Sequence, residues 1–300
     1  MSSPTTTVLS GSELRALLTQ YRRENWRGIQ TPEWQARIVD EVCHDRGESI
    51  FGRLAGIWQV PERAVVLDIG SGAGTFVLAC RRRGLVAFGI EPDRIGQGAA
   101  LTSIQIARRR LADSVFAAAL GEQLPFRDAS FDLITMDQVM EHVSDQAAVL
   151  RQAARVLKPG GTIYLSSPNY LRFYEPHYKI FWFPLLPKIL GRLYLAARGR
   201  NPVMLNQITY TTNKRLQALA RAAAPDCTCI DLHREEFLKK CDGGGFVSFR
   251  ARLVRWSMRL PLIGKWIRNA ALFYLRITEG NCEMLIVQKS SSKEFKRPQE

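Results

Sequence analysis

The chain has 300 residues, of which 46% are hydrophobic and 23% are charged. This balance is typical of a soluble globular protein and excludes wholesale disorder, collagen and a disulfide-rich scaffold. Lysine and arginine outnumber aspartate and glutamate by 42 to 28, so the formal net charge is +14. Such a surplus indicates an anionic partner, which can be a phosphate-bearing ligand, an anionic membrane or a nucleic acid.

The cysteines and the N-terminus indicate a cytoplasmic protein. The 6 cysteines lack the spacing of a zinc site and are expected to be free thiols. The first residues have neither the basic start nor the apolar run of a secretory signal. No uncharged apolar stretch approaches the ~20 residues that cross a bilayer. We therefore predict a cytoplasmic location and no metal site, with peripheral binding to the cytoplasmic face of a membrane still open.

The first 60 residues are predicted to form a tail and a helical cap. Residues 1–12 and 290–300 are polar and are expected to be disordered tails. Thr31 and Pro32, followed by an acid, favour the start of a helix. A second helix, ending before Pro61, is indicated by apolar residues at helical spacing: Ile50, Phe51, Leu54, Ile57 and Trp58.

From residue 61 to residue 289, short apolar strands alternate with helices. The predicted strands span 64–70, 86–90, 115–120, 131–136, 162–166, 227–232 and 283–287. The predicted helices end near Arg83, surround Ile104 to Leu111, and span 145–157 and 212–223. This alternation requires right-handed crossovers. It predicts an α/β fold with a doubly wound, seven-stranded, mostly parallel sheet.

A glycine-rich turn follows the first strand and is the strongest chemical signal. The segment DIGSGAG spans residues 68–74, and its glycines allow a ligand to approach the backbone at a helix N-terminus. The fit to the dinucleotide fingerprint is imperfect, because residue 75 is threonine. Glu91 ends the second strand, where an acid can accept hydrogen bonds from both hydroxyls of a ribose.

Together these residues resemble the class I S-adenosylmethionine-dependent methyltransferases, which have a Rossmann-like fold. Three further segments are similar to motifs of that family and occur in the family's order: EQLPF at 122–126, SFDLI to MEHV at 130–143, and LKPGG at 157–161. The resemblance covers about 64–168. It departs from the family at Leu120, where an aspartate is common.

The resemblance implies S-adenosylmethionine as cofactor and a role for nine residues. Asp68, Gly70 and Gly72 would hold the methionine end, Gly74 would permit the close turn, Glu91 would hold the ribose, Gly121 and Glu122 would flank the adenine, and Asp137 and Gln138 would line the sulfonium side.

Two histidines are candidates for a catalytic base. Methyl transfer from a positively charged sulfur needs a base only when the nucleophile keeps its proton, as a hydroxyl does. His142 follows the fourth strand, and His177 lies in the segment EPHY. Either can instead be a hydrogen-bonded loop histidine. The segment MDQV after the fourth strand lacks the Asn/Asp-Pro-Pro motif of amino-methylating DNA enzymes, so nucleic acid is an unfavoured substrate.

Two insertions, at about 170–211 and 233–280, are expected to cover the active site, because they follow strands whose carboxyl ends face the ligand. The first is rich in aromatic residues, and 243–278 contains 7 basic residues and no acid. On a helix, Phe249, Leu253, Trp256 and Leu260 would share an apolar face, and Arg252, Arg255 and Arg259 a basic one. This pattern is typical of a membrane-surface helix. A lid that packs on the protein remains the alternative.

The sequence therefore predicts O-methylation of a small-molecule or of a lipid- or glycan-linked acceptor at a membrane surface. Two other functions stay open. One is a nicotinamide-dependent oxidoreductase, and the other is a non-catalytic membrane-associated scaffold that keeps the fold.

Overall fold

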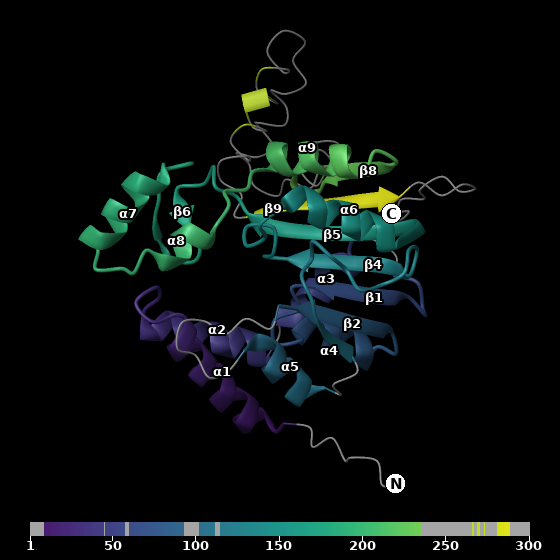
Figure 1. Ribbon diagram of the computed structural model, residues 1–300, viewed down its shortest axis with the longest axis horizontal. Helices are drawn as coiled ribbons and strands as arrows, with labels where there is room; N and C mark the ends of the chain where they lie inside the picture. Colours follow the sequence, from purple (N-terminus) through teal and green to yellow (C-terminus); the bar gives the residue numbers. More distant parts are fainter. Residues whose placement is uncertain are drawn as a thin grey trace, which may run out of the picture.

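A seven-stranded sheet with helices on both faces forms the centre of the molecule, as Figure 1 shows. The computed structural model describes residues 9–44, 46–57, 60–92, 102–111, 115–235, 266, 269–270, 273 and 281–288. The strands are β1 (Val65–Ile69), β2 (Val86–Glu91), β3 (Phe116–Ala118), β4 (Phe131–Asp137), β5 (Leu157–Pro168), β6 (Tyr174–Glu175), β7 (Ile180–Phe181), β8 (Cys227–Asp231) and β9 (Asn281–Gln288).

The strand order of the large sheet is β3-β2-β1-β4-β5-β9-β8. The first five of these strands pair in parallel, and β9 runs antiparallel to both of its neighbours. This confirms the predicted mostly parallel, doubly wound sheet. The strand order reverses on either side of β1, and ligands of such folds bind beyond the carboxyl ends of the strands at that point.

The helices form a layer on each face of the sheet. Their bounds are α1 (Gly11–Asn25), α2 (Pro32–His44), α3 (Arg46–Ala55), α4 (Thr75–Arg82), α5 (Ser103–Arg110), α6 (Gln146–Val156), α7 (Lys188–Ala197), α8 (Val203–Gln207) and α9 (Asn213–Ala223). On β1, Leu67 packs with residues of α6 and α9, whereas Val66 packs with residues of α3, α4 and α5. This alternation follows from the two-residue period of a strand.

The N-terminal region is more ordered than the sequence indicates. The prediction of a tail over residues 1–12 is wrong at its end, because α1 begins at Gly11. Ser10 caps this helix in a capping box with Glu13, in which each side chain bonds the other residue's backbone amide. The predicted helix start at Pro32 is confirmed. The next helix, α3, ends at Ala55 and is shorter than predicted.

The segment LKPGG, which precedes the predicted fifth strand at 162–166, belongs to that strand. It is the beginning of β5, which starts at Leu157. The pairing with β4 is irregular there, with a register shift between Phe131 and Leu133, and Gly160 has a φ of 79°. The positive φ explains why a glycine stands at this irregularity.

The first insertion is a small helical unit with its own core, rather than the irregular segment expected from its composition. It contains the β6–β7 hairpin, α7 and α8. In Figure 1 this unit lies beyond one end of the strands, on the same side as α1 and α2. Trp182, Leu195 and Leu205 are fully buried in its centre, where they pack with Ile29 and Tyr178.

The predicted basic amphipathic helix lies outside the described residues, since Phe249, Leu253, Trp256, Leu260 and the three arginines are not among them. The same holds for the tail 290–300. Of the cysteines that the structure describes, Cys43, Cys80, Cys227, Cys229 and Cys282 are free thiols, as predicted. In the described part of the chain, we find no helix with the length and apolarity needed to traverse a bilayer.

Candidate active site

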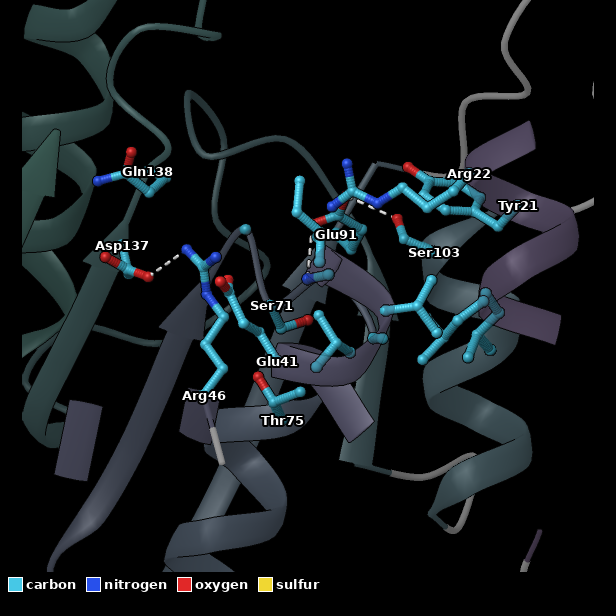
Figure 2. Close-up of a pocket in the computed structure, with 18 of the residues that line it drawn as sticks. Tyr21, Arg22, Glu41, Arg46, Ser71, Thr75, Glu91, Ser103, Asp137 and Gln138 are labelled. Carbon is cyan, nitrogen blue, oxygen red and sulfur yellow. Dashed lines mark hydrogen bonds and ion pairs between the residues drawn. The ribbon is translucent and has the colours of Figure 1, made fainter. Parts of the chain in front are cut away.

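A cavity of about 330 Å³ lies at the carboxyl ends of β1, β2 and β4. Its floor is the β1–α4 turn, and its walls come from α1, α2, α3, the start of α5 and the β6–β7 hairpin. Figure 2 shows side chains from α1, α2, α3 and the start of α5 around this turn. The sequence predicted the floor, because its residues belong to one local motif.

The glycine-rich turn approaches the cavity with its backbone. Gly70 has a φ of 72°, and a Cβ there would lie 2.4 Å from Cγ2 of Val139. Gly74 lies behind the cavity as the N-cap of α4, and a Cβ there would lie 2.6 Å from the ring of Phe116. Larger residues at these positions would be strained. Gly70 and Gly72 line the cavity, and their role at the methionine end of the cofactor stays a prediction.

Asp68 is buried at the end of β1. Its Oδ1 accepts a hydrogen bond of 2.6 Å from the hydroxyl of Thr135 on β4. Burial raises the pKa of Asp68 to about 7, and the bond from Thr135 opposes this shift. The carboxyl group is therefore poised to ionise when a cationic group enters the cavity.

Glu91, at the end of β2, is held by two donors. The backbone N–H of Gly72 donates to Oε2 over 3.1 Å, and the hydroxyl of Ser103 donates to Oε1 over 2.9 Å. Burial raises the pKa of Glu91 above its usual value, and these two bonds offset part of the shift. The carboxylate links the glycine-rich turn to the start of α5, and its role at the ribose stays a prediction.

Asp137 ends β4 and Gln138 follows it, and both line the cavity. Their place on the sulfonium side of the cofactor stays a prediction. Arg46 of α3 donates to Asp137 over 2.7 Å, so this acid is already paired. Gln138 has a φ of 58° and its amide donates to the hydroxyl of Ser166 over 3.2 Å. The positive φ costs energy for a residue other than glycine, which is a feature of functional sites.

Gly121 and Glu122 do not line the cavity. Gly121 is buried, and a Cβ there would meet Ile69 and Val149 at 3.3 Å. The carboxylate of Glu122 accepts a bond of 2.9 Å from the backbone N–H of Ser144 and a longer one from Asp145. In this structure Glu122 therefore anchors the loop before α6, and its role at adenine stays a prediction.

The N-terminal helices supply cavity residues that the sequence did not indicate: Tyr21, Arg22, Glu41 and Arg46, labelled in Figure 2. Burial, together with the nearby Arg46, lowers the pKa of Arg22 to about 10. The capping box before α1 was the signal that could have revealed the first of these helices.

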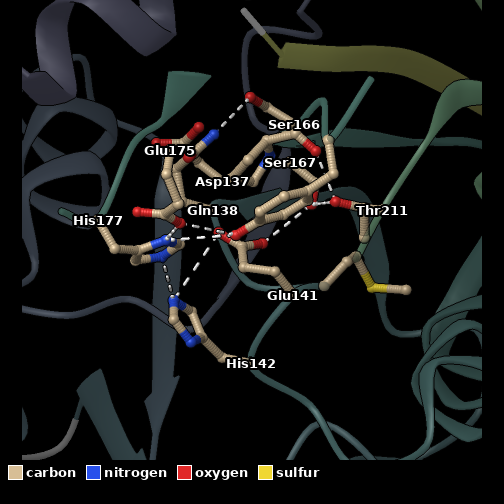
Figure 3. A network of polar contacts seen from close by, with 12 residues as sticks. Asp137, Gln138, Glu141, His142, Ser166, Ser167, Glu175, His177 and Thr211 are labelled. Carbon is tan, nitrogen blue, oxygen red and sulfur yellow. Dashed lines mark hydrogen bonds and ion pairs between the residues drawn. The ribbon is translucent and has the colours of Figure 1, made fainter. Parts of the chain in front are cut away.

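His142 and His177 are brought together by the fold, as Figure 3 shows. Their Nε2 atoms lie 3.1 Å apart, although 35 residues separate them in the chain. Nδ1 of His177 lies 2.9 Å from a carboxylate oxygen of Glu175, which also accepts from the hydroxyl of Tyr170. A carboxylate can only accept, so the proton of the neutral His177 ring is on Nδ1. Its Nε2 then presents a lone pair to His142.

Glu141 lies beside this pair and is fully buried. The hydroxyl of Ser167 donates to its Oε2 over 2.9 Å, while Oε1 lies 3.8 Å from Nε2 of His142. Burial raises the pKa of Glu141 to about 7. Burial and then His177 lower the pKa of His142 well below its usual value. The two histidines predicted as alternatives thus form one cluster with a buried acid.

The chain matches one protein-family model and is similar to several methyltransferases. Residues 42–241 match the model of a family described as a methyltransferase domain. An uncharacterized methyltransferase from Mycobacterium sp. (strain KMS) is 34% identical over 129 residues, which cover 41% of this chain and 48% of that protein. A ubiquinone biosynthesis O-methyltransferase from Paracidovorax citrulli (strain AAC00-1) is 34% identical over 145 residues, which cover 45% of this chain and 56% of that protein.

The chain thus spans about half the length of the curated relatives that it matches. Among solved structures, the YcgJ protein from Bacillus subtilis aligns with a TM-score of 0.46 and 19% identity, over 83% of this chain and 100% of that one. The matched range 42–241 contains the glycine-rich turn, Glu91 and both histidines.

Proposed function

This chain belongs to the methyltransferase-domain family, and S-adenosylmethionine is its methyl donor, so we propose that it methylates a hydroxyl oxygen. The acceptor would be a small molecule, or a molecule linked to a lipid or a glycan, at a membrane surface. Residues 61–289 would form the catalytic unit, with the first 60 residues as its cap. The family leaves no support for the nicotinamide-dependent alternative. The non-catalytic scaffold is separated from an enzyme by the turnover experiment below.

The described residues fit this donor. When bound, the cofactor supplies a methyl group on a positively charged sulfur, so the protein's task is to position the reactants and to exclude water. Asp68 can accept from the ammonium of its methionine end, and Glu91 can accept from its ribose. His142 and His177 line the same cavity and would act on the acceptor.

The observation that carries the membrane part of the proposal is an exposed apolar surface on the first insertion. On α7, Ile189 is 67% exposed and Leu193 is 65% exposed, while the opposite face packs Gly191 and Leu195 into the insertion's core. We call this surface the insertion patch, and it consists of Ile189, Leu190, Leu193, Phe173, Phe181 and Phe183, each about half exposed or more. Exposed apolar surfaces of this kind mark sites of interaction.

The charge around the insertion patch favours an anionic membrane as its partner. Arg172, Arg192 and Arg198 are exposed in the same insertion. Between residues 169 and 212 the sequence contains one acid, Glu175, which is fully buried. Each basic residue near an anionic surface contributes ~1 kcal/mol. An apolar face with a basic surround and no exposed acid is typical of a membrane-surface element.

The β6–β7 hairpin connects this surface to the cavity. Pro176, His177 and Lys179, in the turn of the hairpin, line the cavity. Phe173 and Phe181, at its outer end, are about half exposed, and their rings stack with centroids 5.9 Å apart. An acceptor held in a bilayer under the insertion patch would thus be close to the element that carries His177.

The named relatives include both an O-methyltransferase and a C-methyltransferase. The relative from Paracidovorax citrulli is named as an O-methyltransferase of ubiquinone biosynthesis. A relative from Xylella fastidiosa (strain M23) is named as a C-methyltransferase of ubiquinone and menaquinone biosynthesis. The proposal of oxygen rests on the histidine cluster, because a hydroxyl must lose its proton when its oxygen takes the methyl group, and a nearby imidazole can assist this loss.

Turnover is tested with the purified protein, methyl-labelled S-adenosylmethionine, and lipid and aqueous extracts of the organism that carries the gene. The proposal expects label in the lipid extract, on a product heavier by one CH₂ and resistant to mild base as a methyl ether. Label confined to the aqueous extract would remove the membrane part. Cofactor binding with no label in either extract would favour the scaffold.

We expect the protein to sediment with anionic vesicles at low salt and to bind neutral vesicles far less. Changing Ile189 and Leu193 together to Glu should weaken this binding at least roughly tenfold, because fully burying each aliphatic side chain stabilises by ~1.5–3 kcal/mol. Changing the exposed Gln123 and Ala222 together to Glu adds the same charge elsewhere and should have little effect. Equal binding by the two double variants would contradict the role of the insertion patch.

Affinity for the product S-adenosylhomocysteine should depend on pH through Asp68. A site whose acid has a pKa of about 7 must lose a proton before it can pair with the ammonium of the ligand. Affinity should therefore fall roughly tenfold for each pH unit below 7 and level off above it. Titration calorimetry between pH 5.5 and 8 measures this.

The matched variant is Asp68→Asn, which keeps the shape of the side chain and cannot ionise. It should bind the ligand more weakly at pH 8 and show little pH dependence. A wild-type affinity that stays constant over this range would show that Asp68 does not bind the ammonium.

A further inference from the structure

Glu141, His142 and His177 bring three metal-binding atoms to one point of the cavity wall. Within the ranges that the structure describes, this is the one group of three such residues whose ligand atoms lie close together, all within 4.8 Å of one another. Glu141 and His142 follow β4, and His177 comes from the β6–β7 hairpin. Figure 3 shows the two rings turned toward each other beside the carboxylate.

The spacing of these atoms matches a small metal ion. Zinc binds histidine nitrogen and carboxylate oxygen at about 2.0–2.1 Å, so two ligands of a tetrahedral site lie roughly 3.3 Å apart. The two Nε2 atoms are 3.1 Å apart, and Nε2 of His142 is 3.8 Å from Oε1 of Glu141. Small rotations of the side chains would bring all three atoms to bonding distance of one ion.

The ligand atoms are oriented from behind by further polar groups. Glu175 holds Nδ1 of His177 at 2.9 Å, and the hydroxyl of Ser167 holds the other oxygen of Glu141 at 2.9 Å. A carboxylate behind a histidine is the usual support of a metal-bound imidazole, because it directs the opposite nitrogen and its lone pair toward the metal.

One of the three ligand atoms lacks another partner. Oε1 of Glu141 is buried and has no hydrogen bond to any residue that the structure describes. A buried carboxylate oxygen is costly unless it is hydrogen-bonded or bound to a cation. Two nitrogens that face each other at 3.1 Å can share one proton, and a metal ion in its place would satisfy all three atoms.

We propose that Glu141, His142 and His177 form a site for a divalent transition metal, with zinc as the ion that best suits two imidazoles and one carboxylate. Three protein ligands leave a fourth position open, as in catalytic zinc sites. Since His142 and His177 line the cavity, that position faces the cofactor site. From the sequence we predicted no metal site, because the third ligand lies in an insertion, 35 residues beyond the second.

The metal also gives the acceptor hydroxyl a route to ionisation, and this part rests on the proposed O-methylation. The acceptor oxygen would bind at the open position, where the metal lowers the pKa of its hydroxyl, and the proton would leave to solvent. The oxygen then forms its bond to the methyl carbon as the bond from that carbon to the cofactor's sulfur breaks. The electron pair of that bond stays on sulfur, which becomes a neutral thioether.

Metal binding is tested directly on the purified full chain, without cofactor or acceptor. The protein is stripped with a chelator, loaded with zinc and dialysed, and its metal content is measured by plasma mass spectrometry. Competition with a chromophoric zinc chelator then gives the affinity. We expect about one zinc ion per chain, and no comparable retention of magnesium, which prefers oxygen ligands.

The variants His142→Ala, His177→Ala and Glu141→Gln should each weaken zinc binding roughly 100-fold or more. Glu175→Gln, which changes the group that orients the His177 ring and removes no metal ligand, should weaken it about 10–100-fold. His233→Gln removes a histidine outside the cavity and should leave it unchanged. Circular dichroism confirms folding, and the near-isosteric Glu141→Gln provides the result if a histidine variant unfolds.

Loss of zinc from the wild type on dialysis would overturn the proposal. Equal retention by the wild type and the three ligand variants would also overturn it, because the ion would then sit on other groups such as the cysteines. These outcomes are separate from the proposed function. Methyl transfer by a metal-free wild type would contradict the metal's part in ionising the hydroxyl, whereas zinc binding without methyl transfer to a hydroxyl would contradict O-methylation alone.

Discussion

Replacing Glu91 by Ala should lower the affinity for S-adenosylhomocysteine roughly ten- to hundredfold. The carboxylate is fixed by Gly72 and Ser103 at the end of β2, where it can accept from both ribose hydroxyls. Hydrogen bonds to a charged group contribute ~1.5–3 kcal/mol, which corresponds to this range of affinities. Titration calorimetry at pH 8, above the pKa of Asp68, measures the effect without interference from that group.

Two control variants distinguish the loss of hydrogen bonds to the ligand from a change in the structure around Glu91. Ser103→Ala removes one donor to Glu91 but none of the ligand bonds, so it should weaken binding only a few-fold. Glu91→Gln keeps the shape and one acceptor, so its loss should be smaller than that of Glu91→Ala. Wild-type affinity in a folded Glu91→Ala variant would mean that β2 does not place its terminal acid on the ribose.

The sheet could be predicted from the sequence because each strand carries a local signal. The strands β1, β2 and β4 are short apolar runs between helices, and such runs are typical of buried parallel strands. The small unit formed by α7, α8 and the hairpin was missed, because its aromatic residues pack against one another and against Ile29 across large sequence separations. No local period shows such packing.

The floor of the active-site cavity was also predictable from local sequence signals, whereas its walls were not. Asp68, Gly70 and Glu91 belong to a turn and a strand end whose spacing is fixed by one β–α–β unit. Arg22 and Arg46 reach the cavity from the N-terminal helices, and only the fold brings them there. Glu122 shows the opposite case: it matches a motif, but its carboxylate accepts a hydrogen bond from the backbone of a loop instead of lining the cavity.

The histidines show what the fold adds to a list of candidates. From the sequence, His142 and His177 were competing choices for a single base. Their Nε2 atoms lie 3.1 Å apart, and Glu175 holds Nδ1 of His177. The two rings are therefore parts of one hydrogen-bonded cluster. When residues act as one unit, replacing either of them removes the function of both, whereas two separate bases would lose their functions independently.

We therefore expect His142→Ala and His177→Ala each to lower kcat roughly 10²–10⁴-fold, the range for loss of a group that assists proton removal. Affinity for S-adenosylhomocysteine should stay within a few-fold of wild type, because neither ring supplies the bonds assigned to Asp68 or Glu91. The readout is S-adenosylhomocysteine formed with the extract that contains the acceptor.

The double variant makes the test sharper. If the two rings hold one ion or share one proton, removing the second ring should cost little beyond the loss of the first, so the effects should be far from additive. Multiplied effects in the double variant would assign the histidines to separate steps. Near-normal turnover in both single variants, with His233→Gln as the matched control, would leave positioning of the acceptor against the methyl group as the whole source of catalysis.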